Sequence, residues 1–194
     1  MRSDEEQLRL SQEVAAAFEP LVERLAPAIH AYLARRAPRD ADELLGDVWL
    51  AAFGSRATFD PARGSARAWF FGVARHVLLA HYRRTTRDAV PDSTGATEVD
   101  WAAVDARLDA AAVRPALKEA LASLPPVERE LLLLVGWEQL TPSEAAEVVG
   151  IPAGTARSRL HRARERMRER LAGSAQVLDE RRTEPEGDSS WTSS

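Results

Sequence analysis

The chain contains no cysteine among its 194 residues. This absence excludes a disulfide framework and any metal site built on thiolates, and it suits a reducing cytoplasm. Only four histidines are present, and no two of them are spaced four residues apart. The sequence also lacks a glycine-rich phosphate loop and the motifs that activate a nucleophile. We therefore expect no metal, no cofactor and no catalytic residue.

Long apolar runs are also missing. No run approaches the roughly 20 apolar residues that cross a bilayer, and residues 1–7 are too charged for a signal peptide. Hydrophobic residues make up 45% of the chain and charged residues 29%, which is the balance of a globular protein. We expect a soluble, cytoplasmic protein that does not insert into a membrane.

Apolar residues recur at spacings of three and four along most of the chain, which is the pattern of amphipathic helices. The length suits two small domains, and domains of that size favour helical bundles over a large sheet. We predict an all-α fold of two small helical domains joined by a flexible linker. The predicted domains cover 10–86 and 113–172, with an acidic linker at 87–112 and a disordered tail at 173–194.

The main helices are predicted from this periodicity and from their capping residues. In the first domain, a loop over 54–65 separates two helices. In the second domain, a break at Pro125-Pro126 precedes a strongly apolar helix, which we expect at the buried centre. The predicted helices span 42–53, 67–84, 115–123, 127–137, 141–149 and 152–171, and a short helical piece is expected at 101–108 in the linker.

The net charge of −4 argues at first against nucleic acid as a partner. The distribution of charge changes that interpretation, because binding to a polyanion depends on the local patch. Residues 63–87 hold six arginines and no acidic residue. Residues 157–170 hold seven arginines against two glutamates. Both domains therefore carry a basic helix.

The segment from Thr141 to Arg170 has the layout of a helix-turn-helix, with a capped short helix, a turn at Gly150 and a longer basic helix. In the second helix, Ala156, Leu160, Ala163, Met167 and Leu171 form one apolar stripe. The opposite face holds hydrogen-bond donors that suit base edges and phosphates, namely Thr155, Arg157, Ser158, Arg159, His161 and Arg162. The alternative is a solvated face with arginine–glutamate pairs.

The helix over 67–84 has an outer face that mixes basic and apolar groups: Arg75, His76, Leu79, Tyr82 and Arg83. Such a face suits unpaired bases, which stack on flat or apolar groups beside a charged backbone. A contact surface for another helical protein is the alternative.

Several segments resemble extracytoplasmic-function sigma factors of the sigma-70 family. The segments similar to region 2 of that family are 18–21, 42–53, 68–76 and 82–84, and those similar to region 4 are 121–125, 128–134 and 150–164. The chain departs from many relatives at Gly46, His76 and Ala80, which bears mainly on its −10 sequence preference.

The resemblance implies three surfaces. The helix over 42–53 would bind RNA polymerase core through Asp42, Glu43, Leu45, Asp47, Val48 and Leu50. The −10 element of promoter DNA would be opened and held by Phe59, Asp60, Trp69, Arg75, His76, Leu79, Arg83 and Arg84. The last helix would bind the −35 element through the six residues named above for its outer face. An anti-sigma factor is a common partner in the family, and the sequence identifies none.

Other functions stay open on the residues alone. One is a free-standing helix-turn-helix regulator with a ligand-sensing or dimerising N-terminal half. Another is a helical enzyme of nucleic-acid metabolism, although Glu43 and Asp47, which share a helical face, have no histidine or phosphate loop nearby. A regulator would bind its operator alone as a dimer, whereas a sigma factor would need polymerase core.

Overall fold

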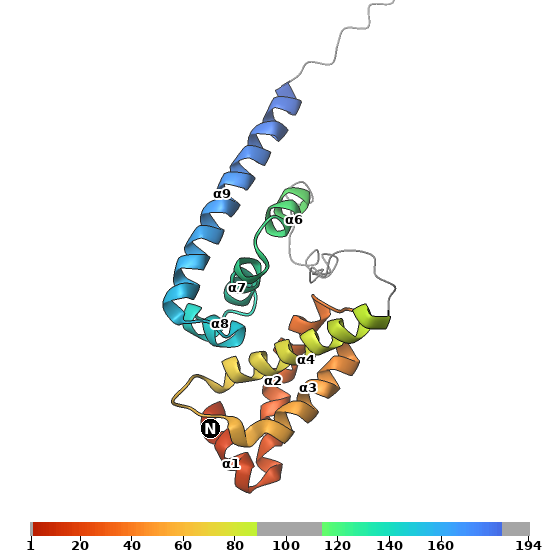
Figure 1. Cartoon of the computed structure of the whole chain (residues 1–194), viewed down its shortest axis with the longest axis vertical. Coiled ribbons are helices and arrows are strands. Elements are labelled where there is room, and N and C mark those ends of the chain that lie inside the picture. The colour runs from red at the N-terminus through yellow and green to blue at the C-terminus, as the bar shows by residue number, and fades with distance from the viewer. Residues whose placement is uncertain (1, 89–113, 184–194) are drawn as a thin grey trace, which may run out of the picture.

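A computed structural model describes residues 2–88 and 114–183, with side chains over 2–85 and 115–172. All regular structure in these described ranges is helical (Figure 1). The first half holds α1 (Asp4–Glu13), η1 (Ala15–Phe18), α2 (Glu19–Ala34), α3 (Ala41–Ser55), η2 (Arg56–Thr58) and α4 (Ala66–Asp88). The second half holds α6 (Arg114–Ala122), α7 (Pro126–Gly136), α8 (Pro142–Val149) and α9 (Ala153–Thr183). The predicted all-α fold is confirmed.

The N-terminal domain is built around the antiparallel packing of α2, α3 and α4. Tyr32, Phe70 and Phe71 are fully buried at its centre. The Trp49 ring of α3 stands edge-on to the Phe70 ring of α4, with the ring centres 5.7 Å apart. Aromatic rings prefer such edge contacts, so these side chains hold α3 and α4 in one register.

Helix α1 is an element that the sequence prediction missed, since the predicted domain begins at residue 10. Ser3 caps the helix by accepting a hydrogen bond from the Glu6 amide, and the Glu6 side chain accepts one from the Ser3 amide. Leu8 is fully buried against the domain core. The spacing Ser3-x-x-Glu6 is a capping box and was the available signal for this helix.

The C-terminal domain has α7 at its centre, as predicted, with Leu131 and Leu134 fully buried. Thr141 and Glu144 form a reciprocal capping box at the start of α8. Gly150 ends that helix in the left-handed conformation, with φ of 78°. Residues other than glycine adopt this conformation at a cost, so glycine suits the turn before α9.

The predicted disordered tail is wrong for residues 173–183, because α9 continues as a helix to Thr183. Ala175, Gln176, Leu178 and Glu180 favour helix, and the helix ends shortly before Pro185, which disfavours helix in the residue before it. Residues 184–194 and the linker piece expected at 101–108 lie outside the described residues.

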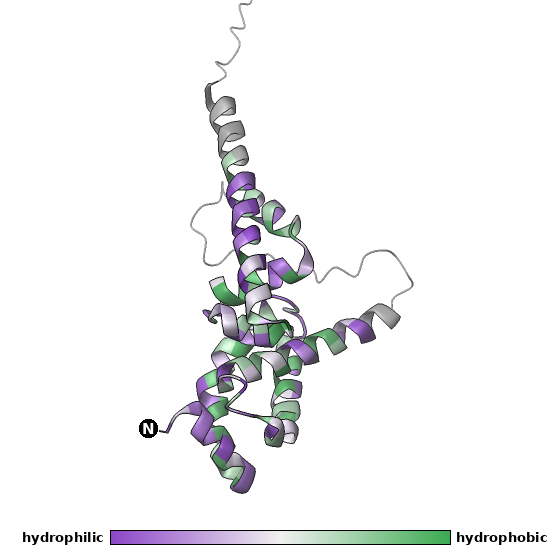
Figure 2. Cartoon of the chain, turned by 60° about the vertical axis from the view of Figure 1, so that its left-hand side comes forward, coloured by the Kyte–Doolittle hydropathy of each residue, from purple (hydrophilic) through white to green (hydrophobic). Residues whose placement is uncertain are grey.

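The two domains pack against each other, with α8 lying on α4 (Figure 1). The apolar core runs across this contact, because one cluster includes Phe71 and Leu78 of α4 together with Ala146 and Val148 of α8. Figure 2 shows hydrophobic residues gathered in the packed helices and a mostly hydrophilic surface along α9. In the described ranges, no helix has the length and apolar character of a membrane span.

Candidate nucleic-acid interface

The packing of α9 directs its predicted outer face to solvent. Ala156, Leu160 and Ala163 are almost completely buried, and Met167 is buried one turn later. This confirms the apolar stripe that the sequence predicts. On the opposite side, Arg157, Ser158, His161 and Arg162 are exposed, while Thr155 and Arg159 are partly buried at its margins. The outer face therefore presents several hydrogen-bond donors to a large partner.

Contacts within α9 order this face. The Ser158 hydroxyl donates to the Thr155 carbonyl oxygen over 2.9 Å, and Arg162 Nε lies 3.4 Å from the Ser158 carbonyl oxygen. His161 Nε2 lies 3.2 Å from a Glu165 carboxylate oxygen. Glu165 thus contacts a histidine of the same face. The positive end of the helix dipole adds to the attraction for phosphate.

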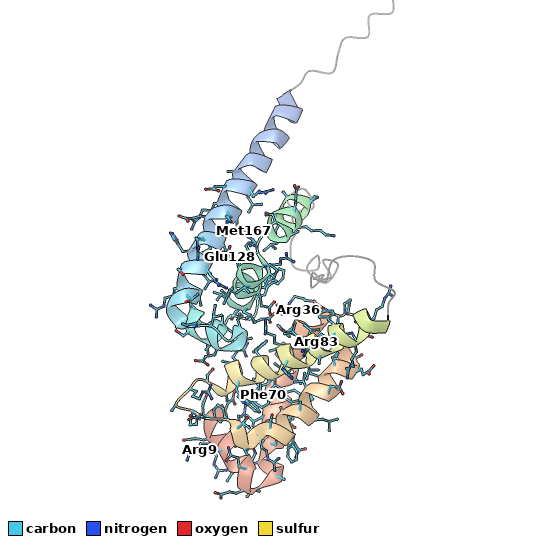
Figure 3. The ribbon with its side chains drawn as sticks, viewed as in Figure 1. Arg9, Arg36, Phe70, Arg83, Glu128 and Met167 are labelled. Atoms are coloured by element: carbon cyan, nitrogen blue, oxygen red, sulfur yellow. The ribbon has the colours of Figure 1, made fainter. Side chains whose placement is uncertain are left out.

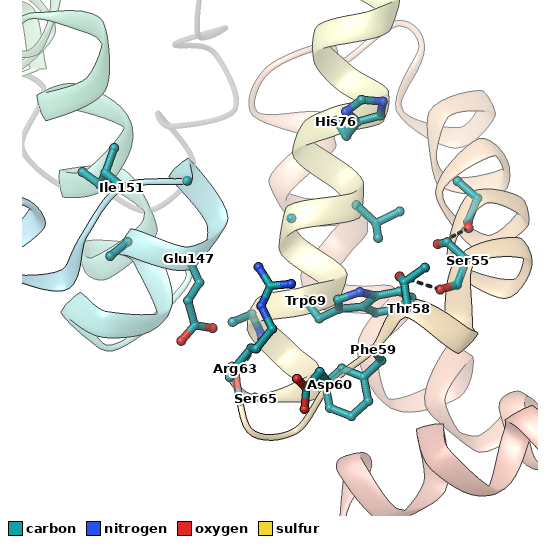
Figure 4. A pocket seen from close by; sticks show the side chains of 17 residues that line it. Ser55, Thr58, Phe59, Asp60, Arg63, Ser65, Trp69, His76, Glu147 and Ile151 are labelled. Atoms are coloured by element: carbon teal, nitrogen blue, oxygen red, sulfur yellow. Dashed lines mark hydrogen bonds between the residues drawn. The ribbon is translucent and has the colours of Figure 1, made fainter.

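The residues predicted for the −10 element divide between a cavity and the far end of α4. A cavity of about 830 Å³ is lined by Phe59, Asp60, Trp69 and His76, among other residues (Figure 4). Arg75 and Leu79 are partly buried further along α4, and Arg83 and Arg84 are exposed near its end. The structure therefore brings half of the predicted set to one concave surface.

Phe59, which was predicted to contact the −10 element, is largely buried in the free chain. Only 6% of it is exposed, and its ring stands edge-on to Trp69 with the ring centres 6.0 Å apart. Burial against Trp69 leaves only a small part of Phe59 at the cavity wall, so its contact with a base stays a prediction. Tyr82 also departs from its expected outward position, because it is half-buried and its hydroxyl donates to the Arg36 carbonyl oxygen.

The α3 surface predicted to bind polymerase carries mostly accessible side chains. Leu50 is 76% exposed, which is unusual for a large apolar residue. Asp42 and Glu43 are exposed, and Leu45 and Asp47 are partly exposed. Val48 is fully buried in the core. The helix turns Val48 inward in the free chain, and its contact with polymerase stays a prediction.

The other wall of the cavity comes from the C-terminal domain, which the sequence prediction did not place there. Ala146 and Glu147 of α8 and Gly150 and Ile151 of the following turn line it. The Glu147 carboxylate comes so close to Gly64 that a Cβ atom there would lie 1.8 Å from Glu147 Oε2. No local sequence signal links positions 64 and 147, because the contact forms only when the domains pack.

The pKa values of two α8 glutamates at this contact shift in opposite directions. Burial and the charge of Glu144 raise the pKa of Glu147, although Arg63 acts in the opposite direction. Burial also acts to raise the pKa of Glu144, but hydrogen bonds from Ser65 and Thr141 and the charge of Arg67 lower it overall. The Ser65 hydroxyl donates to Glu144 Oε1 over 2.6 Å. Ionised Glu144 thus favours the interdomain contact.

No group of histidine and acidic side chains suited to a metal ion occurs in the part of the chain that the structure describes. The structure instead presents three surfaces. They are the basic helix α9 after its glycine turn, the concave aromatic face beside α4, and the exposed acidic and apolar face of α3. Such surfaces bind macromolecules and hold them in register.

Family models match both domains. The model described as Sigma-70 region 2 matches residues 21–88, and the model described as Sigma-70, region 4 matches residues 114–167. The two matches correspond to α2–α4 and to α6–α9 up to Met167.

Curated relatives and solved structures agree with these matches. The chain is 36% identical over 160 residues to the ECF RNA polymerase sigma factor SigF of Caulobacter vibrioides, covering 80% of this chain and 86% of the relative. It is 32% identical over 149 residues to the RNA polymerase sigma-E factor of Streptomyces coelicolor, covering 77% of this chain and 80% of the relative.

Two solved structures share the fold. CnrH in complex with the cytosolic domain of CnrY matches with a TM-score of 0.58 and 22% identity, over 92% of this chain and 99% of the other. The sigma factor RpoE in complex with the anti-sigma factor NepR, from Bartonella quintana, matches with a TM-score of 0.56 and 23% identity, over 80% of this chain and 96% of the other. Domain matches, sequence identity and fold therefore agree that this chain belongs to the sigma-70 family, in its extracytoplasmic-function (ECF) group of sigma factors.

Proposed function

We propose that this chain joins RNA polymerase core and directs it to promoters with a −10 and a −35 element. The observation that carries the proposal is the outer face of α9, where exposed donors follow a glycine turn and the apolar stripe is buried. The exposed α3 surface around Leu50 supports core binding, and the concave face of α4 supports −10 binding. The chain then acts in the cytoplasm, where polymerase and the chromosome are.

The proposed mechanism is two-part recognition without covalent chemistry. Polymerase holds the two domains at a fixed separation, so the second DNA contact forms at a high effective concentration. The α9 face anchors the upstream element. The α4 face then holds bases that leave the stack, which offsets an unstacking cost of a few kcal/mol.

Two substitutions separate the proposed surfaces. Arg162→Ala removes an exposed donor of α9, and we expect weaker promoter binding by the polymerase complex with unchanged affinity for core. Asp47→Arg reverses a charge on α3, and we expect weaker core binding. Affinity for fluorescent core measures the first step, and protection of promoter DNA measures the second. Equal loss of both activities in the Arg162 variant would contradict the separate roles.

A free-standing regulator is not favoured by the family assignment, and its behaviour differs in solution. The sigma factor should bind promoter DNA weakly by itself and strongly with core. A regulator would bind a two-fold operator without polymerase. We also propose an anti-sigma factor as a partner, because the two solved structures named above are complexes, one of them with an anti-sigma factor. Co-purification from the native cell tests this partner.

A further inference from the structure

Helix α1 contacts both ends of the connection between α3 and α4. This connection, residues 56–65, contains Phe59 and Asp60 and leads into the turn of α4 that carries Trp69. All three residues belong to the set predicted for the −10 element. Helix α1 lies before the segment that matches Sigma-70 region 2, and the proposed function gives it no role so far.

The first end of the connection is held by two reciprocal hydrogen bonds. Arg56 Nε donates to the Ser11 carbonyl oxygen over 3.0 Å, and Gln12 Nε2 donates to the Arg56 carbonyl oxygen over 3.1 Å. The Arg56 guanidinium also lies over the Phe53 ring, with its Cζ atom 3.9 Å from the ring centre. The last turn of α1 and the start of the connection are therefore joined where α3 ends.

The second end of the connection is held by Glu5. Its Oε1 atom accepts a hydrogen bond from the Ala66 amide over 3.1 Å. The first amides of a helix have no partner within that helix. At the start of α4, the Ser65 hydroxyl accepts from the Ala68 amide, and Glu5 satisfies the Ala66 amide from a different helix. Because Ala66 is fully buried, loss of this acceptor would leave a shielded amide without its partner.

The charge of Glu5 suits this position. Burial and the charge of Glu144 act to raise the pKa of Glu5, but hydrogen bonds from its own amide, from the Ala66 amide and from Ser3 lower it overall. Glu5 is therefore ionised at neutral pH. A carboxylate at the N-terminal end of a helix is stabilised by the helix dipole, so the charge adds to the hold on α4.

Helix α1 is itself fixed by contacts that do not involve the connection. Arg24 of α2 donates from Nη2 to Asp4 Oδ1 over 2.6 Å. Gln7 Nε2 donates to the Ala17 carbonyl oxygen over 2.7 Å. Figure 3 shows α1, marked by Arg9, packed against the side of the domain where α4 begins. The helix can therefore serve as a rigid support for the connection.

We infer that α1 positions the −10 face: Glu5, Ser11 and Gln12 clamp the connection between α3 and α4, and Glu5 is a positioning residue for promoter opening. The inference rests on the proposed function for its consequence, but the clamp itself is a property of the free chain. A loop that is already held in one shape loses less conformational freedom when it binds. Without the clamp, ordering the connection would offset part of the free energy gained from binding unstacked bases.

Amide hydrogen exchange in the free full-length chain, followed by NMR, tests the clamp without polymerase or DNA. Glu5→Ala removes the acceptor of the Ala66 amide, and we expect this amide to exchange about tenfold faster. Glu5→Gln keeps an acceptor oxygen at the same distance along the side chain and should retain most of the native protection. Native-like exchange of Ala66 in Glu5→Ala would overturn the clamp, and so would a Glu5→Gln variant that exchanges as fast as Glu5→Ala.

The rate of promoter opening tests the consequence. Core polymerase with each variant is mixed with a promoter mapped for the native chain that carries 2-aminopurine in its −10 element, and the rise in fluorescence reports opening. We expect Glu5→Ala to slow opening about tenfold. Gln12→Ala, which breaks a neutral hydrogen bond at the other end of the connection, should slow it less. Affinity for core should stay native in both, because neither residue lies on the α3 surface.

Two controls separate positioning from a general loss of charge or of stability. Glu13→Ala removes an exposed carboxylate from the same helix and should open the promoter at the native rate. Ile29→Val trims a fully buried side chain of α2, which lowers the stability of the domain without changing the clamp. It should also open the promoter at the native rate. Opening that slows as much in Ile29→Val as in Glu5→Ala would overturn the positioning role.

The outcomes separate the clamp from the proposed function. If the native chain opens no promoter with core, the proposed function and the positioning role fail together, whereas the exchange of Ala66 still decides the clamp. If Ala66 exchanges faster in Glu5→Ala but the promoter opens at the native rate, the positioning role is overturned. If exchange and opening change together and Glu5→Gln restores both, α1 positions the −10 face.

Discussion

At the scale of single residues, the recognition face of α9 divides its arginines by position. Arg162 is exposed at the middle of the face, and Arg157 is exposed at one margin. A central side chain reaches base edges in a groove, whereas a marginal one meets phosphates on the groove wall. The two positions should therefore affect binding in different ways, although both carry the same charge.

Arg157→Ala and Arg162→Ala should be distinguishable by salt titration. Loss of a phosphate contact at Arg157 should weaken binding to all sequences alike and reduce the slope of log affinity against log salt by about 1. Loss of a base contact at Arg162 should cost about 1–3 kcal/mol and relax preference at one base pair. Binding of the polymerase complex to a promoter and to point-substituted promoters measures both. Identical behaviour of the two variants would contradict the assignment.

At the scale of helices, sequence periodicity predicted most of the fold. The stripe of Ala156, Leu160 and Ala163 is buried as expected, because helical spacing and one apolar face determine which side packs. The predicted end of α9 failed because the helix runs through Gly173, and residues 174–183 contain no proline that would stop it. The family resemblance assigned Val48 and Phe59 to binding surfaces. Both side chains are apolar and pack into the domain core.

The turn between α8 and α9 gives a prediction for element stability. Gly150 has φ of 78°, with open space around its Cα atom. Gly150→Ala should therefore lower stability through backbone strain alone, by about 1–2 kcal/mol, without a steric clash. Urea unfolding measures the change. Gly154→Ala is the control, because that glycine lies inside α9 and alanine favours helix there; a loss at Gly154 equal to that at Gly150 would argue against strain in the turn.

The charge of Glu144 on α8 gives a pH prediction. Its folded-state pKa is lowered below the ordinary value of 4.5 by hydrogen bonds and by Arg67, which together outweigh burial. A group whose pKa falls on folding stabilises above its unfolded pKa and loses that contribution as pH drops. The native chain should therefore be more stable than Glu144→Gln at neutral pH, with a difference that shrinks below pH 4.5.

Glutamine suits this comparison because it preserves the capping box while removing the charge. Urea unfolding of both proteins across acidic pH measures the difference. A difference that stays constant with pH would show that the charge of Glu144 makes no contribution.

At the scale of the whole molecule, the closed contact between domains is the part that the sequence could not predict. Arg35, Arg36 and Glu138 are charged residues at the ends of helices, and such residues are usually solvated. They become buried only because the two domains pack. The sequence also predicted separate basic helices in each domain, and it had no signal that α8 would cover the α4 face. Local patterns determine helices and faces, but not how domains with a long connection meet.

Run-off transcription shows whether this chain gives polymerase its promoter specificity. Purified core polymerase would transcribe genomic DNA fragments with and without the chain, and the start sites would be mapped. We expect discrete start sites that appear only with the chain and share two upstream elements at a fixed spacing. The absence of any start site that depends on the chain would contradict it.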